Sequence, residues 1–114
     1  MALPNTFEGK RNKAIILVLV DCGLRLGELL NLKMADINME QQILKVDGKT
    51  GERVVRYGST TAKVLKKYMR VRASINGHID SLWITGKGVA LKDSSVETLF
   101  IALSRKVFIL IRIY

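Results

Sequence analysis

The stretch Asp21–Leu32, with the sequence DCGLRLGELLNL, decides the fold that we predict for this chain. A glycine turn at Gly23 precedes a short amphipathic helix, because three leucines recur at helical spacing on one face: Leu26, Leu29 and Leu30. Arg25 stands at the start of that helix, and Glu28 follows one turn later, where it can brace the guanidinium. Such a pair is most often a surface ion pair, although a guanidinium beside a glycine turn can also bind two phosphate oxygens.

Composition narrows the class of partner. The chain has 114 residues, enough for one modest core, with 19 basic and 10 acidic residues and a net charge of +9. This excess predicts a polyanionic partner, nucleic acid before membrane, and the longest apolar run, residues 14–20, is too short to cross a bilayer. A single cysteine, Cys22, excludes an internal disulfide and is consistent with a reducing cytoplasm. With only one cysteine and one histidine, the chain has too few ligands for a structural zinc site.

The apolar run at 14–20 is ambiguous by itself. Its β-branched residues favour a strand, and periodicity does not separate a buried strand from a buried helix. A capping residue upstream, Asn5 or Thr6, and a stop at Gly23 favour a helix. We therefore expect a first helix that ends at Gly23 and a second from about Arg25 to Met34.

A β-hairpin follows. The strand-like runs Gln42–Val46 and Arg53–Tyr57 flank a glycine-containing turn with Lys49 at its tip. The tripeptide Gly48–Thr50 resembles the end of a nucleotide-binding phosphate loop, but Ile43 occupies the position of that motif's first glycine, and the turn leads into a strand. Nucleotide binding is therefore not expected.

A third helix, capped by Ser59 or Thr60, is predicted to reach about Arg72. One face carries the residues expected in the core, namely Ala62, Leu65, Tyr68, Met69 and Arg72. Another face is basic and carries Lys63, Lys66, Lys67 and Arg70. That basic face is either a solvated surface or a track along a nucleic-acid backbone.

The part of the sequence from Ser81 onward predicts a short strand, a turn and a helix. The strand is Ser81–Thr85, the turn contains Gly86, Lys87 and Gly88, and a capping box at Ser94 opens a fourth helix. The segment 107–114 is almost wholly apolar and needs a partner to cover it, which makes self-association through this tail an expectation.

The order of these pieces resembles the start of the catalytic domain of the tyrosine recombinases, the phage integrase family. The family signature Gly-Leu-Arg-x-x-Glu-Leu-x-x-Leu is matched at every fixed position from Gly23 to Leu32, and the hairpin lysine follows. The resemblance spans Leu3–Lys106 and favours a helix for residues 14–20. It implies an α+β, mostly α, partial DNA breaking-rejoining fold, with about four helices and a small antiparallel sheet. Residues 1–114 would form a truncated catalytic domain, with the tail 107–114 departing from the family.

What the resemblance implies is DNA cleavage and rejoining through a phosphotyrosine, without metal or cofactor. Arg25 matches the first of two arginines that hold the non-bridging oxygens of the scissile phosphate. Lys49 matches the hairpin lysine that protonates the departing 5′ oxygen, and Glu28 would support Arg25. The residues expected to bind DNA are Arg53, Arg56, Lys63, Lys66, Lys67 and Lys87.

The remaining site residues of the family are not matched in these 114 residues. The only histidine, His78, has no arginine three residues on, and neither Tyr57, Tyr68 nor Tyr114 lies in a segment like that of the nucleophile. We therefore expect a cytoplasmic, nucleoid-associated recombinase fragment that contacts DNA but does not cleave it alone. A non-catalytic DNA-binding module and a dimerising module remain alternatives.

Overall fold

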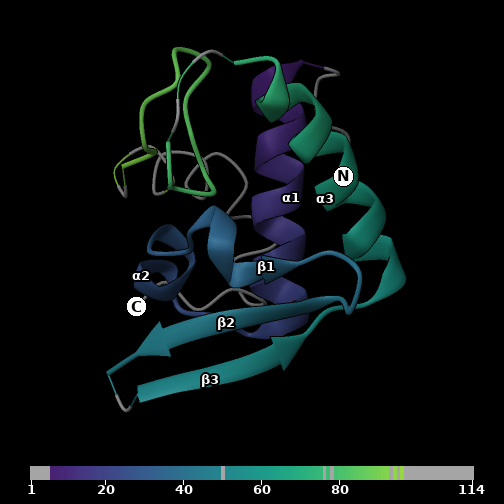
Figure 1. Cartoon of the computed structure of the whole chain (residues 1–114), viewed down its shortest axis with the longest axis vertical. Coiled ribbons are helices and arrows are strands. Elements are labelled where there is room, and N and C mark those ends of the chain that lie inside the picture. Colours follow the sequence, from purple (N-terminus) through teal and green to yellow (C-terminus); the bar gives the residue numbers. More distant parts are fainter. Residues whose placement is uncertain are drawn as a thin grey trace, which may run out of the picture.

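Two long helices and a small antiparallel sheet form the framework of the protein. The computed structural model describes residues 6–49, 51–75, 77, 79–92, 94 and 96. Its elements are α1 (Phe7–Cys22), α2 (Leu26–Leu30), the 3-10 helix η1 (Met34–Asp36), β1 (Ile37–Asn38), β2 (Ile43–Gly48), β3 (Gly51–Arg56) and α3 (Ser59–Ala73). The helices α1 and α3 pack side by side, the sheet crosses one end of them, and α2 lies between α1 and the hairpin (Figure 1). The predicted class, mostly α with a small antiparallel sheet, is confirmed.

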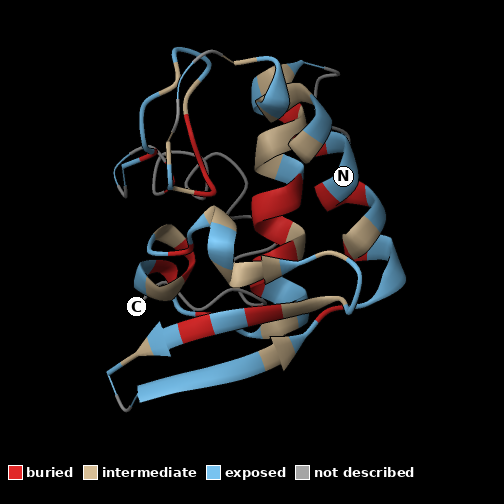
Figure 2. Ribbon diagram, in the orientation of Figure 1, coloured by how far each residue is buried: buried red, intermediate tan, exposed pale blue. Residues whose placement is uncertain are grey.

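The helix α1 includes the apolar run that sequence periodicity left ambiguous. The hydroxyl of Thr6 accepts a hydrogen bond from the Gly9 amide at 3.0 Å and caps the first turn. Gly23 ends the helix in the left-handed conformation, with φ of 64°. Five residues of the run are buried, and they form the centre of the core (Figure 2): Ala14, Ile15, Ile16, Val18 and Leu19.

The second helix is shorter than the predicted span Arg25–Met34. It ends at Leu30 because the main chain after it pairs with a distant segment. The Leu82 amide donates to the Leu32 carbonyl at 2.9 Å, and the Met34 amide donates to the Asp80 carbonyl at 2.7 Å. A helix that continued to Met34 would use the Met34 amide internally, so its pairing with Asp80 sets the boundary.

The hairpin is longer than the two predicted strands. Pairing of Asp47 with Glu52 and of Gly48 with Gly51 extends the ladder, which leaves only residues 49 and 50 at the tip. Gly51 has φ of 113°, a backbone conformation that favours glycine. One face of β2 packs on the core through Leu44 and Val46, and the hairpin tip projects away from α1 and α3 (Figure 1).

The cap of α3 comes from another helix and not from Ser59 or Thr60. Gly58 is the N-cap residue, and Asp21 at the end of α1 supplies the acceptor. One Asp21 carboxylate oxygen accepts from the Gly58 amide and from the Thr61 hydroxyl, each at 2.8 Å. This contact fixes the start of α3 against the end of α1.

The segment 79–92 packs on α3 without forming the predicted strand at Ser81–Thr85. Within the described residues it makes only isolated bridges, such as Lys33 with Ser81. The Arg72 guanidinium donates to the carbonyls of Ile79, Ser81 and Leu82 at 2.6 to 3.2 Å and holds the segment in place. Arg72, which was expected on the core face, is thus half-buried as a main-chain clamp.

Several expectations fall outside the described residues: most of the fourth helix, the tail 107–114, His78 and Tyr114. Of the fourth helix, Ser94 and Val96 are described, both are helical, and Val96 is buried. None of the helices in the described ranges combines the length and apolarity that crossing a bilayer requires.

Candidate nucleic-acid interface

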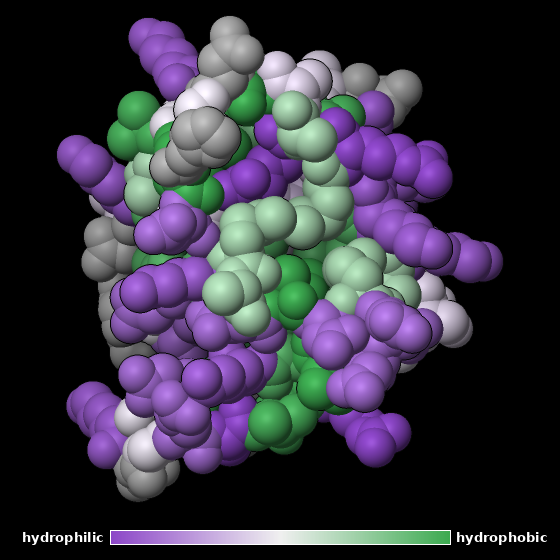
Figure 3. Space-filling view, viewed as in Figure 1, coloured by the Kyte–Doolittle hydropathy of each residue, from purple (hydrophilic) through white to green (hydrophobic). Residues whose placement is uncertain are grey.

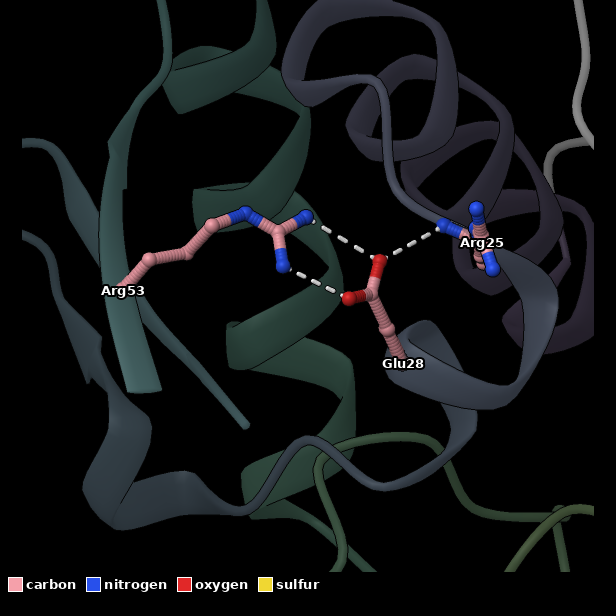
Figure 4. Close-up of polar contacts among 3 residues, drawn as sticks. All are labelled: Arg25, Glu28 and Arg53. Atoms are coloured by element: carbon pink, nitrogen blue, oxygen red, sulfur yellow. Dashed lines mark hydrogen bonds and ion pairs between the residues drawn. The ribbon is translucent and has the colours of Figure 1, made fainter. Parts of the chain in front are cut away.

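The Glu28 carboxylate joins the start of α2 to the hairpin (Figure 4). One carboxylate oxygen accepts from the Arg25 main-chain amide at 2.9 Å. Both oxygens also accept from the Arg53 guanidinium on β3, at 2.6 and 3.0 Å. The Glu28 side chain is only 13% exposed, so this two-pronged ion pair forms at a sheltered position.

The electrostatics agree with that geometry. The hydrogen bond from Arg53 lowers the pKa of Glu28 to about 2, with smaller help from the Arg25 amide and against the opposing effect of burial. The same hydrogen bond raises the pKa of Arg53. Glu28 is therefore a carboxylate at neutral pH, where it acts as a fixed acceptor.

Gly48 allows the hairpin to approach this carboxylate closely. A Cβ atom placed on Gly48 would lie 2.6 Å from a Glu28 carboxylate oxygen and 3.3 Å from an Arg53 guanidinium nitrogen. Since real Cβ contacts are longer, any larger residue at position 48 would displace the ion pair. The glycine that precedes Lys49 is thus part of the same assembly as Arg25 and Glu28.

The structure changes the role of Glu28 from the one predicted. Glu28 was expected to brace the guanidinium of Arg25, but it binds the main-chain amide of Arg25 and the guanidinium of Arg53. Strand alternation carried a signal for this outcome: Arg53 pairs with buried Val46 and so lies on the inward face of the hairpin.

Arg25 and Lys49 are both exposed and present their charges to solvent. Arg25 has an extended backbone at the N-cap of α2, and its guanidinium makes no hydrogen bond to any residue that the structure describes. Lys49 lies at the hairpin tip, next to Gly48. Two exposed cations, neither of which donates a side-chain hydrogen bond within the described part of the chain, thus flank the Glu28 carboxylate.

The other predicted DNA-binding residues lie elsewhere on the surface, apart from Arg53, whose guanidinium is committed to Glu28. The predicted DNA-binding residues on α3 are exposed, namely Lys63, Lys66 and Lys67. Arg56 at the end of β3 and Lys87 in the turn 86–88 are exposed as well. Hydrophilic side chains gather over α3 on one side of Figure 3 and over α2 and the hairpin on the other, with weakly hydrophobic surface between them.

Two of the three tyrosines are described, and both serve the core. The Tyr68 ring is buried, and its hydroxyl donates to the Leu82 carbonyl at 2.7 Å and accepts from the Ile84 amide at 3.1 Å. Tyr57 is 4% exposed, and its hydroxyl donates to the Asn38 carbonyl at 3.3 Å. Burial raises the pKa of both phenols, the opposite of what a nucleophile needs. Nor do three or more His, Cys, Asp or Glu side chains gather as a metal site within the described ranges.

Known proteins are similar to this chain in sequence and in fold. Tyrosine recombinase XerC of Chlorobaculum parvum is 34% identical over 99 residues, which are 80% of this chain and 30% of XerC. XerA recombinase superposes with a TM-score of 0.77 at 30% identity, over 87% of this chain and 35% of that one. XerH site-specific recombinase bound to difH substrate has the same fold, with a TM-score of 0.74 at 23% identity, over 92% of this chain and 31% of that one.

The chain thus spans about a third of the length of these recombinases. The phage integrase family model matches residues 1–109, which is nearly the whole sequence. The chain belongs to the phage integrase family.

Proposed function

We propose that this chain is the phosphate-binding part of a tyrosine recombinase catalytic domain. Arg25 binds the non-bridging oxygens of a DNA phosphate, and Lys49 is the proton donor for the departing 5′ oxygen when the complete enzyme cleaves. The observation that carries the proposal is the position of Glu28, whose carboxylate contacts the Arg25 amide and lies against Gly48, the neighbour of Lys49.

The chemistry of the two cations fits these roles. A guanidinium keeps its charge at all physiological pH values and offers a planar fork that matches two phosphate oxygens, so it stabilises charge that develops on them. An ammonium group carries a proton that it can give to an alkoxide leaving group. Both side chains are exposed, as groups that must reach a DNA backbone need to be.

The charge of the chain supports DNA as the partner. The net charge is +9, and Lys63, Lys66 and Lys67 form an exposed basic face on α3 that would contact further phosphates. The fold is shared with XerH bound to difH substrate and with a Tn1549 transposon integrase in complex with transposon right end DNA. These likenesses support DNA as the class of partner.

We further propose that the 114 residues bind DNA without cleaving it. The sequence contains no His-x-x-Arg segment, and the two described tyrosines are buried core residues. A nicked suicide duplex, which traps phosphotyrosine intermediates, should therefore give no covalent adduct with this chain. An adduct that migrates with the protein on a denaturing gel would overturn this part of the proposal.

Binding is tested by fluorescence anisotropy of a labelled duplex over a range of KCl concentrations. Arg25→Ala and Lys49→Ala should each weaken binding about tenfold and lower the salt slope by about 1, since each removes a phosphate contact. The matched control is Lys45→Ala, on the same hairpin, whose ammonium pairs with Glu52 on the outer face. If the control weakens binding as much as the two test variants, the proposed site is wrong and general charge explains the binding.

A further inference from the structure

Arg53 differs from every other cation of the hairpin in where its charge is directed. Its two terminal nitrogens donate to the two oxygens of Glu28, at 2.6 and 3.0 Å. The other ion pair of the hairpin, Lys45 with Glu52, is a single contact of 3.5 Å with both side chains more than half exposed. Among the ion pairs of the described residues, only the Arg53 pair joins the hairpin to another element.

The contacts at Glu28 restrict how the hairpin can move relative to α2. A bidentate pair fixes both the distance and the orientation of the guanidinium, whereas a single contact fixes only the distance. Gly48, the last residue of β2, lies so close to the same carboxylate that a Cβ atom there would be 2.6 Å from one of its oxygens. The Glu28 carboxylate in turn accepts a hydrogen bond from the Arg25 amide. The hairpin is thus connected through Glu28 to the candidate phosphate ligand, Arg25.

We propose that Arg53 is a positioning residue, which holds the Lys49-bearing hairpin tip at a fixed place relative to Arg25 before DNA binds. This inference rests on the proposed function of Arg25 and Lys49. In this proposal Arg53 acts through Glu28 and not through phosphate, because one N–H of each terminal guanidinium nitrogen is donated to that carboxylate. Because the hairpin tip is already ordered before DNA binds, less conformational entropy is lost when the complex forms.

The first test uses the free protein and therefore does not depend on DNA. Backbone 15N relaxation is measured at Gly48, Lys49 and Gly51 in the wild type and in Arg53→Met, with Lys45→Met as the matched control. We expect order parameters at the tip to fall from about 0.8 to below about 0.6 in Arg53→Met and to stay unchanged in the control. Arg53→Lys, which retains the charge without the fork, should give an intermediate value and replaces Arg53→Met if that variant does not fold. Unchanged tip order in Arg53→Lys and Arg53→Met would overturn the inference.

The second test asks whether Lys49 depends on Arg53 in DNA binding. The weakening caused by Lys49→Ala, about tenfold in the wild type, should shrink to within about twofold when Arg53 is methionine, since a displaced tip no longer reaches the phosphate. If Arg53 contacts DNA directly, the factors by which Arg53→Met and Lys49→Ala each weaken DNA binding should multiply in the double variant. That result would refute the positioning role. If Lys49→Ala has no effect in the wild type, the proposed function fails, while the relaxation experiment still decides the positioning role.

Discussion

Replacing Glu28 by glutamine should destabilise the protein and remove part of its sensitivity to acid. The glutamine side chain is nearly the same shape and can still accept the Arg25 amide, but it cannot form the ion pair with Arg53. The substitution therefore isolates the charge of one carboxylate from its packing.

The magnitude follows from the pKa of Glu28, which is about 2 in the folded protein against an ordinary value of 4.5. At about 1.4 kcal/mol for each pKa unit, this difference sets an upper limit of about 3 kcal/mol. The Arg53 side chain is 42% exposed, so solvent screens the pair. We therefore expect a loss of about 1 to 2 kcal/mol at pH 7.

The pH dependence has a definite sign. Because folding lowers the pKa of Glu28, its stabilisation is complete above about pH 4.5 and is lost as the pH falls toward 2. Urea unfolding of the wild type and of Glu28→Gln from pH 7 to pH 2.5 should give a difference that is constant above pH 5 and shrinks below it. Glu52→Gln, at the exposed ion pair, is the control and should change stability by less than about 0.5 kcal/mol. Equal stability of wild type and Glu28→Gln at pH 7, or a difference that does not vary with pH, would show that the charge of Glu28 does not stabilise the fold.

Three further substitutions test the packing around this site and the long helices by chemical denaturation. Gly48→Ala should lower the free energy of unfolding by about 1 to 2 kcal/mol, because the new methyl group displaces the Glu28 carboxylate. The loss should be much smaller in a Glu28→Ala background, and equal losses in both backgrounds would contradict the close approach of Gly48 to Glu28. Asp21→Ala should cost about 1 to 2 kcal/mol by uncapping α3, whereas Asp21→Asn should retain most of the stability; a neutral alanine variant would argue against the cap. Arg72→Met should cost about 2 to 3 kcal/mol and alter the near-ultraviolet dichroism of buried Trp83, since three hydrogen bonds to main-chain carbonyls are lost; an unchanged spectrum would show that other contacts hold the segment.

The parts of the fold governed by local signals were predictable from the sequence. The Thr6 cap and the Gly23 stop set the limits of α1, and two apolar runs around a glycine turn located the hairpin. Boundaries set by distant partners were not predictable. The end of α2 depends on pairing with residues 80–82, and the cap of α3 comes from Asp21. A single sequence carries no direct signal for either contact.

The sequence proposes members for the candidate site, and the structure adds the contacts between them. Arg25, Glu28 and Lys49 were identified from a motif and its order along the chain. The link between Glu28 and Arg53 joins residues 25 positions apart, and it depends on the register of β3 relative to β2. The prediction of Arg53 as a DNA-binding cation therefore did not include its contact with Glu28, for which strand alternation carried a signal.

In the function that we propose, Arg25 and the hairpin tip containing Lys49 contact the DNA backbone. The most direct measurement is a titration of the 15N-labelled chain with an unlabelled duplex, followed through main-chain amides and the arginine side-chain Nε groups. We predict that the largest shifts occur at the Arg25 Nε group and at the amides of Gly48 and Lys49, with smaller shifts along the basic face of α3, and that they reverse at high salt. Shifts confined to α3, with none at Arg25 or the hairpin tip, would contradict the account.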